Sequence, residues 1–136
     1  MTSSTHHFSL EGAEAPTAEG RYVKVADVAS VSFAPGLDFQ PVLGENTMVN
    51  VVTFAENSVA PKHVHKEEQI VIVLEGEFEF DLDGDVRTMR PGDICVVPPW
   101  VPHGAETKDS TCREIDVFNP PRETLLQHAR AQRGEA

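Results

Sequence analysis

The strongest constraint on the fold is a succession of short strand-like runs between residues 21 and 118, separated by turn signals. In the stretch EFEFDLDG, residues 77–84, acidic residues alternate with phenylalanine or leucine. This period of two predicts a half-buried strand that ends in a tight turn at Asp83-Gly84. The runs recur at intervals of roughly eight to twelve residues, which favours an all-β sandwich or barrel over alternating strands and helices. The predicted strands are residues 21–25, 37–43, 46–55, 69–76, 77–84, 86–89, 93–99 and 112–118.

The two ends of the chain differ from its middle. The length of 136 residues favours a single domain. Residues 1–20 are polar and lack periodicity, so we expect a flexible N-terminal arm before a barrel domain over residues 21–120. Residues 121–136 are predicted to form a C-terminal helix or tail, in which Leu125 and Ala129 belong to an apolar stripe.

The chain is strongly acidic, because 22 acidic residues oppose 11 basic ones and give a formal net charge of −11. This charge repels phosphate backbones and anionic membrane surfaces, so neither nucleic acid nor a membrane is an expected partner. No apolar run approaches the roughly 18 residues of a membrane span, and the polar start lacks a secretory signal. Cys95 and Cys112 lack metal or redox spacing and are expected to be reduced. These features predict a soluble cytoplasmic protein.

A set of histidines carries the clearest chemical signal. His63 and His65 stand two apart, so they project from the same face of an extended chain, and Glu67 and Gln69 share that face. His103 follows in PPWVPHG, where a chain folded back on itself at its turns can bring it beside the first pair. Three imidazoles and an amide or carboxylate oxygen suit one divalent transition metal ion, and Ni, Zn, Fe or Mn remain open. Either Gln69 or Glu67 completes this set.

Two longer stretches carry a family resemblance. HVHKEEQIVIVLEG resembles the first cupin motif, and GDVRTMRPGDICVVPPWVPHG resembles the second. The resemblance implies an all-β, double-stranded β-helix, the cupin jelly-roll barrel, with a short C-terminal helix and a metal held by His63, His65, Gln69 and His103. The first motif usually has Glu where this chain has Gln69, and Thr107 replaces an Asn often found after the last histidine. A neutral amide leaves the charge of a divalent ion uncompensated, which makes the ion a stronger Lewis acid.

The sequence after the second motif, REIDVFNPPRETLL, is similar to the ending of the KdgF-like cupins of pectin and alginate breakdown. Those proteins convert 4,5-unsaturated monouronates into linear keto sugars. The resemblance implies catalytic roles for Asp116, as a proton-transfer group, and for Arg122, as the partner of a substrate carboxylate. It also implies a functional role for Phe118, and we expect Phe118 and Trp100 to wall the substrate ring. From the residues alone, Asp116 could equally be a surface strand residue and Arg122 an anchor for the tail helix.

Three classes of function fit these features. The first is a metal-dependent enzyme of lyase or isomerase type in carbohydrate metabolism, which acts on a small oxygen-rich acid, with ketonisation or ring opening of 4,5-unsaturated uronates as the leading reaction. The second is an iron-dependent cupin dioxygenase, against which Gln69 counts because oxygen chemistry more naturally uses a carboxylate ligand or none. The third is a non-catalytic ligand-binding cupin. By resemblance, the expected assembly is a homodimer.

Overall fold

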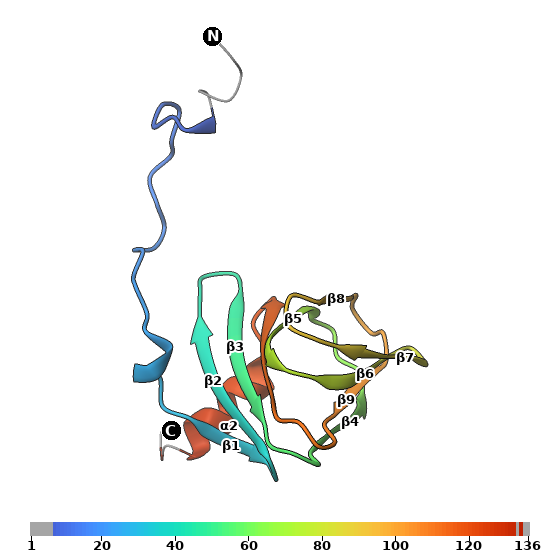
Figure 1. The fold of residues 1–136 in the computed structure, drawn as a ribbon. Coiled ribbons are helices and arrows are strands. Elements are labelled where there is room, and N and C mark those ends of the chain that lie inside the picture. The colour runs from blue at the N-terminus through green and yellow to red at the C-terminus, as the bar shows by residue number, and fades with distance from the viewer. Residues whose placement is uncertain (1–6, 133, 135–136) are drawn as a thin grey trace.

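The structure is a computed structural model that describes residues 7–132 and 134. Two antiparallel sheets make up the barrel, with strand orders β1-β2-β3-β10-β5-β8 and β4-β9-β6-β7 (Figure 1). The predicted all-β jelly-roll fold with a short C-terminal helix is confirmed. The strands are β1 (Val31–Ala34), β2 (Leu37–Leu43), β3 (Met48–Phe54), β4 (Val59–His63), β5 (Glu68–Gly76), β6 (Phe78–Leu82), β7 (Asp85–Met89), β8 (Ile94–Val97), β9 (His103–Glu106) and β10 (Cys112–Asn119).

The core lies between the two sheets and follows the alternation of the strands. On β6, Phe78 and Phe80 are buried, whereas Glu79 and Asp81 are only partly buried, as the sequence predicts. The turn from β6 to β7 also forms as predicted, with positive φ at both Asp83 and Gly84. The buried core residues are Leu37, Val52, Phe54, Val71, Val73, Phe78, Phe80, Met89, Val97, Ala105 and Cys112.

The strand predicted at residues 21–25 is wrong. Residues 21–24 are exposed and irregular, and a short 3₁₀ turn, η1 (Val25–Asp27), follows them. The side chain of Gln40 on β2 donates hydrogen bonds to the carbonyls of Val25 and Val28, so side-chain contacts replace a strand ladder here. Residues 7–24 extend away from the barrel (Figure 1).

The helix α2 (Glu123–Gln132) forms within the predicted tail and closes one end of the barrel. Leu125 packs with Met48 of β3 and Phe118 of β10 in a small second cluster, and Ala129 is also buried. The carbonyl of Arg122 accepts hydrogen bonds from the Leu125 and Leu126 amides, so Arg122 stands directly at the start of the helix. This contact fixes the backbone of Arg122 beside the barrel interior.

Gly76 ends β5 in a conformation that few other residues can adopt. Its φ is +69°, and a Cβ at this position would lie 1.9 Å from the carbonyl oxygen of Thr111. The close approach accompanies a register shift between Arg113 and Glu114 on the neighbouring β10. The extra residue at this shift is Leu74 on β5, and β10 keeps its regular alternation of buried and partly buried residues.

Two smaller expectations concern the thiols and membranes. Cys112 is buried, Cys95 is partly buried, and both are free thiols, as expected. Within residues 7–132 and 134, no helix has the length and apolar character that crossing a bilayer requires.

Candidate metal centre and its cavity

Three histidines meet where the two sheets open toward solvent. His63 ends β4 and pairs directly with His103 at the start of β9, and His65 lies in the loop that leads into β5. One ring nitrogen from each histidine lies within 4.8 Å of the other two. The structure therefore brings together residues that are 40 positions apart, as the sequence predicts.

Each imidazole is oriented by a backbone carbonyl two residues away. A carbonyl only accepts hydrogen bonds, so each Nδ1 carries the proton and donates it, which leaves a lone pair on Nε2. This tautomer is the one that presents Nε2 to a metal ion. The three bonds are His63 to Pro61 at 2.7 Å, His65 to Glu67 at 3.0 Å and His103 to Val101 at 2.9 Å.

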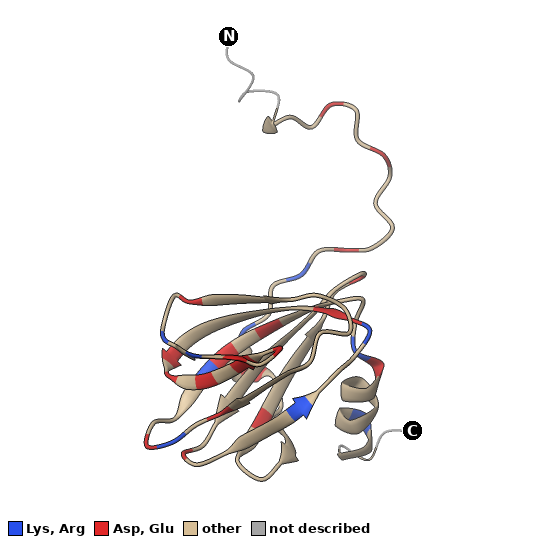
Figure 2. Cartoon of the chain, turned by 90° about the vertical axis from the view of Figure 1, so that its right-hand side faces the viewer, with Lys and Arg blue, Asp and Glu red and all other residues tan. Residues whose placement is uncertain are grey.

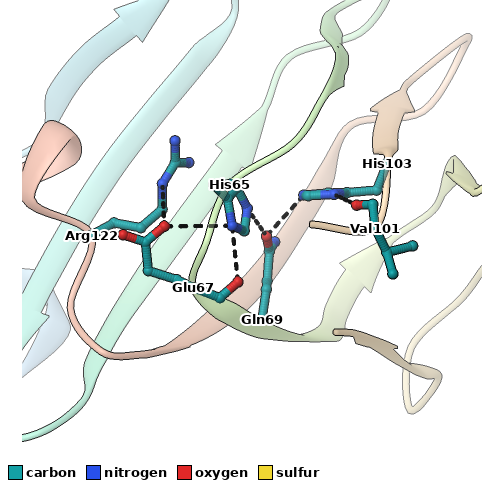
Figure 3. A network of polar contacts seen from close by, with 6 residues as sticks. All are labelled: His65, Glu67, Gln69, Val101, His103 and Arg122. Atoms are coloured by element: carbon teal, nitrogen blue, oxygen red, sulfur yellow. Dashed lines mark hydrogen bonds and ion pairs between the residues drawn. The ribbon is translucent and has the colours of Figure 1, made fainter. Parts of the chain in front are cut away.

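Gln69 completes the set from β5. Its Oε1 lies 3.0 Å from Nε2 of His65 and 3.0 Å from Nε2 of His103 (Figure 3). Its amide nitrogen donates to Oδ1 of Asp116 at 2.9 Å, so the oxygen must face the imidazoles. The lone pairs of Gln69 Oε1, His65 Nε2 and His103 Nε2 therefore face one another with no proton between them. A bound cation would remove their mutual repulsion. The donor set fits a divalent transition metal ion.

Burial keeps these imidazoles neutral. Loss of solvation lowers the pKa of His103 to about 4. It also lowers the pKa of His65, with a further contribution from the charge of Arg122. Neutral rings are the metal-binding form, so the site is ready to bind a cation at neutral pH.

Glu67 lies on the other side of His65. Its carboxylate is 3.6 Å from Nδ1 of His65 and 3.9 Å from Nε of Arg122 (Figure 3). Neither contact involves the Nε2 atoms that face Gln69. Of the two candidates for the fourth ligand, the geometry favours Gln69, and Glu67 pairs with Arg122.

A cavity of about 340 Å³ runs beside the histidines into the barrel. Asp116 and Phe118 line it from the inward face of β10, and Arg122 lines it from the start of α2. The guanidinium carbon of Arg122 lies 5.7 Å from the centre of the Phe118 ring, within the range of a cation–π contact. Burial raises the pKa of Asp116, against hydrogen bonds from Glu114 and Gln69 and the charge of Arg122.

Of the residues predicted to act on or bind the substrate, Asp116, Phe118 and Arg122 line this cavity, and Trp100 lies outside it. Its side chain is 64% exposed and does not line the cavity. Its backbone has a positive φ of 67°, and its amide donates to the carbonyl of His65 at 2.9 Å. The contact of Trp100 with the site is therefore made by its backbone, which ties the loop before β9 to the loop that carries His65.

Sequence reasoning missed two buried polar residues in the barrel. Glu114 faces inward two positions before Asp116 and lines the cavity, and Asn50 is fully buried on β3. A signal existed for both: Glu114 shares the parity of Asp116, and Asn50 interrupts the apolar run MVNVVTF.

The model of the cupin domain family matches residues 50–118, which is half of the chain. The chain is a cupin. It is similar to the pectin degradation protein KdgF of Dickeya dadantii (strain 3937), with 29% identity over 83 residues that cover 60% of this chain and 76% of the relative. The resemblance to KdgF-like cupins predicted from the sequence is thus confirmed.

Solved structures agree with that assignment. The structure of KdgF from Halomonas sp. matches this cupin with a TM-score of 0.75 and 30% identity, and the match covers 79% of this chain and 100% of the other. An RmlC-like cupin from Shewanella frigidimarina matches with a TM-score of 0.73 and 28% identity, over 79% and 96% of the two chains. The similarity to both extends over most of the barrel.

Proposed function

We propose that this cupin is a metal-dependent enzyme of lyase or isomerase type that ketonises and opens 4,5-unsaturated uronates. One observation carries the proposal. The amide of Gln69 joins the imidazole cluster on one side to the carboxylate of Asp116 on the other, inside a cavity that Arg122 also lines. Asp116 can move a proton, Arg122 carries a positive charge, and the imidazoles together with Gln69 can bind a metal ion. These groups lie around one cavity. The similarity to KdgF proteins supports the choice of substrate.

The ligands of the metal ion are His63, His65, His103 and Gln69. When bound, the ion supplies Lewis-acid stabilisation of negative charge that develops on a substrate oxygen. Each of the three histidines is oriented by its own backbone contact through Nδ1, which leaves Nε2 free to bind the ion.

Asp116 moves the proton. Its buried carboxylate accepts from the Gln69 amide through Oδ1, which holds the group next to the metal-binding set. Ketonisation of an unsaturated uronate requires proton transfer between oxygen and carbon, and a buried carboxylate with a raised pKa suits that exchange.

Arg122 binds the substrate carboxylate and Phe118 supports it. Nε of Arg122 faces Glu67, and the Phe118 ring packs against the guanidinium. The planar fork of Arg is suited to a carboxylate. This local positive centre offsets the acidic balance of the chain, which otherwise repels an anion.

A second candidate substrate is favoured by the walls of the cavity. Six phenylalanines line it, which suits a planar and less hydroxylated keto acid. The same proton-transfer chemistry then isomerises or cyclises that acid. The phenylalanines are Phe33, Phe39, Phe54, Phe78, Phe80 and Phe118.

The decisive experiment measures metal content and then turnover of unsaturated galacturonate, followed by loss of its ultraviolet absorbance, with and without oxygen. We expect turnover that needs the metal, is unchanged without oxygen and falls at least about 100-fold in Asp116→Asn. Asp38→Asn, at an exposed position on β2, is the matched control and retains activity. Strict dependence on oxygen indicates the dioxygenase instead, and binding of the uronate without turnover indicates a ligand-binding cupin.

The predicted homodimer is part of the proposal. The outer face of the large sheet exposes Ile94 and Val96 on β8 and Leu74 on β5, which suits burial against a second copy. Sedimentation of the purified protein tests it, and Val96→Glu is expected to shift the population toward the monomer. A monomer at all concentrations contradicts it.

A further inference from the structure

Two buried side chains in the barrel hold polar atoms without a protein partner. Asn50 is 0% exposed, and neither its Nδ2 nor its Oδ1 has a hydrogen-bond partner among the described residues. Glu114 is 3% exposed, and its Oε2 is unpartnered in the same sense. Most buried polar atoms in folded proteins are paired, so three unpaired atoms at two neighbouring positions require an explanation.

The two residues are neighbours on the inward face of the large sheet. Asn50 on β3 pairs with Asp116 on β10, and Val52 pairs with Glu114, so Asn50 and Glu114 lie diagonally across the two strands. Glu114 lines the cavity, and Asn50 shares its strand face with Val52 and Phe54, which also line it. Along β10, Glu114 is further from Gln69 than Asp116 is.

The stability of the protein without substrate does not explain why polar side chains occupy positions 50 and 114. A buried polar atom without a partner costs free energy, and an apolar side chain of the same size removes that cost. Thr107 shows the usual alternative, since its hydroxyl donates to the carbonyl of Ala55 and accepts from the amide of Ser58. Unlike Thr107, Asn50 joins no other part of the described protein through its side chain.

We propose that Asn50 and Glu114 form a hydrogen-bonding subsite that binds a hydroxyl or carbonyl oxygen of the substrate beside Asp116. The amide of Asn50 offers both a donor and an acceptor, and Glu114 offers an acceptor through Oε2. Burial and the nearby charge of Asp116 raise the pKa of Glu114 well above its usual range, which favours the protonated form of its carboxyl group. A hydroxyl group both donates and accepts, so it can satisfy the two residues together.

The inference rests on the proposed function and sharpens the choice of substrate. The carbonyl of an apolar keto acid can accept from Asn50 but cannot donate to Oε2 of Glu114. The ring hydroxyl groups of a uronate can do both. The subsite therefore favours the oxygen-rich substrate over the second candidate.

The test compares Asn50→Leu and Glu114→Met with the metal-loaded wild-type enzyme. We expect the KM for unsaturated galacturonate to rise about tenfold in each variant, because a hydrogen bond to the substrate is lost. The melting temperature should stay the same or rise, because an unpaired polar group is removed. Glu114→Gln keeps an oxygen acceptor, so its KM should rise less than that of Glu114→Met. Thr107→Val is the matched control for a buried polar residue, and its melting temperature should fall while its KM is unchanged.

An unchanged KM in Asn50→Leu and Glu114→Met would overturn the subsite, as would a fall in melting temperature without a change in KM. A wild-type enzyme that is inactive on the unsaturated uronate overturns the proposed function instead. The subsite is then decided by thermal shift with saturated galacturonate. Stabilisation of the wild type but not of Asn50→Leu supports it, and equal or absent stabilisation of the two overturns it.

Discussion

Gln69 uses both ends of a neutral amide, which no carboxylate can imitate. Its oxygen faces the imidazoles and its NH₂ group donates to Asp116. Gln69, in place of the usual Glu of the motif, is therefore suited to the neighbouring carboxylate of Asp116. A Glu at this position would set two carboxylates about 3 Å apart, and one of them would have to take up a proton.

We expect Gln69→Glu to retain the metal ion and to lose at least about 100-fold in turnover, because Asp116 loses its donor and its correct protonation state. Metal analysis and steady-state kinetics of the same preparation measure the two effects. Gln40→Glu is the matched control, since the Gln40 side chain donates to the backbone carbonyls of Val25 and Val28 and does not line the cavity. Wild-type activity in Gln69→Glu would contradict this role of the amide.

Glu114 makes the stability of the protein depend on pH. Burial raises its pKa in the folded state, so above about pH 4.3 the unfolded chain ionises while the folded protein keeps the proton. The free energy of unfolding therefore falls as pH rises between the unfolded and the folded pKa.

Glu114→Gln removes this titration. We expect its stability advantage over the wild type to grow with pH, by up to about 1.4 kcal/mol per pH unit within that window. Urea unfolding at several values between pH 5 and pH 8 measures the difference, and a constant offset across the series rules the explanation out.

Strand parity made several site residues predictable. The spacing of His63 and His65 placed both on one face, and the spacing of Asp116 and Phe118 did the same on β10. The unpaired state of Asn50 could not be predicted, because it depends on which atoms other strands bring near. Trp100 was expected in the wall of the site, but its positive φ and the hydrogen bond from its amide to His65 depend on the folded loop.

At the scale of single elements, the end of β5 depends on the backbone conformation of Gly76. We expect Gly76→Ala to lower the free energy of unfolding by at least about 2 kcal/mol, because the new Cβ would overlap the Thr111 carbonyl and φ is positive. Urea unfolding measures the loss. In the control Gly84→Ala, φ is also positive but the added Cβ meets open space, so only about 1 kcal/mol should be lost. Equal losses in the two variants contradict the overlap.

Local sequence predicted some elements and not others. The alternation of acidic and apolar residues over 77–82 predicted β6, because one face of that strand is buried and the other is only partly buried. β4 and β9 were not predicted, although they carry His63 and His103. Both are short and contain Pro61 or Gly104, and they become strands only by pairing with each other and with β6. Residues 21–25 had a strand-like composition but no partner strand.

The net negative charge of the whole molecule repels an anionic substrate, whereas the positive charge of Arg122 attracts it. Acidic segments outnumber basic ones over the strands of the barrel (Figure 2), whereas Arg122 is largely buried beside the cavity. Salt screens exposed charges more than buried ones.

Raising the ionic strength from about 10 mM to about 200 mM should therefore lower the KM for an unsaturated uronate roughly two- to threefold, with kcat unchanged. Steady-state kinetics over a salt series measures it. The neutral methyl ester of the substrate is the control and should show no such trend. A KM that rises with salt would mean that the attraction to Arg122 outweighs the field of the whole chain.

The carbonyls that orient the three imidazoles each belong to a residue two positions from the histidine itself. The direction of each imidazole is thus set by the adjacent main chain, although Phe118 and Phe80 also pack against His65 and His103. Mutations at other cavity phenylalanines, such as Phe33 and Phe54, can change which molecule fits while the metal ligands keep their orientation. Single substitutions in the cavity wall can therefore change the substrate of such a barrel without the loss of its metal ligands.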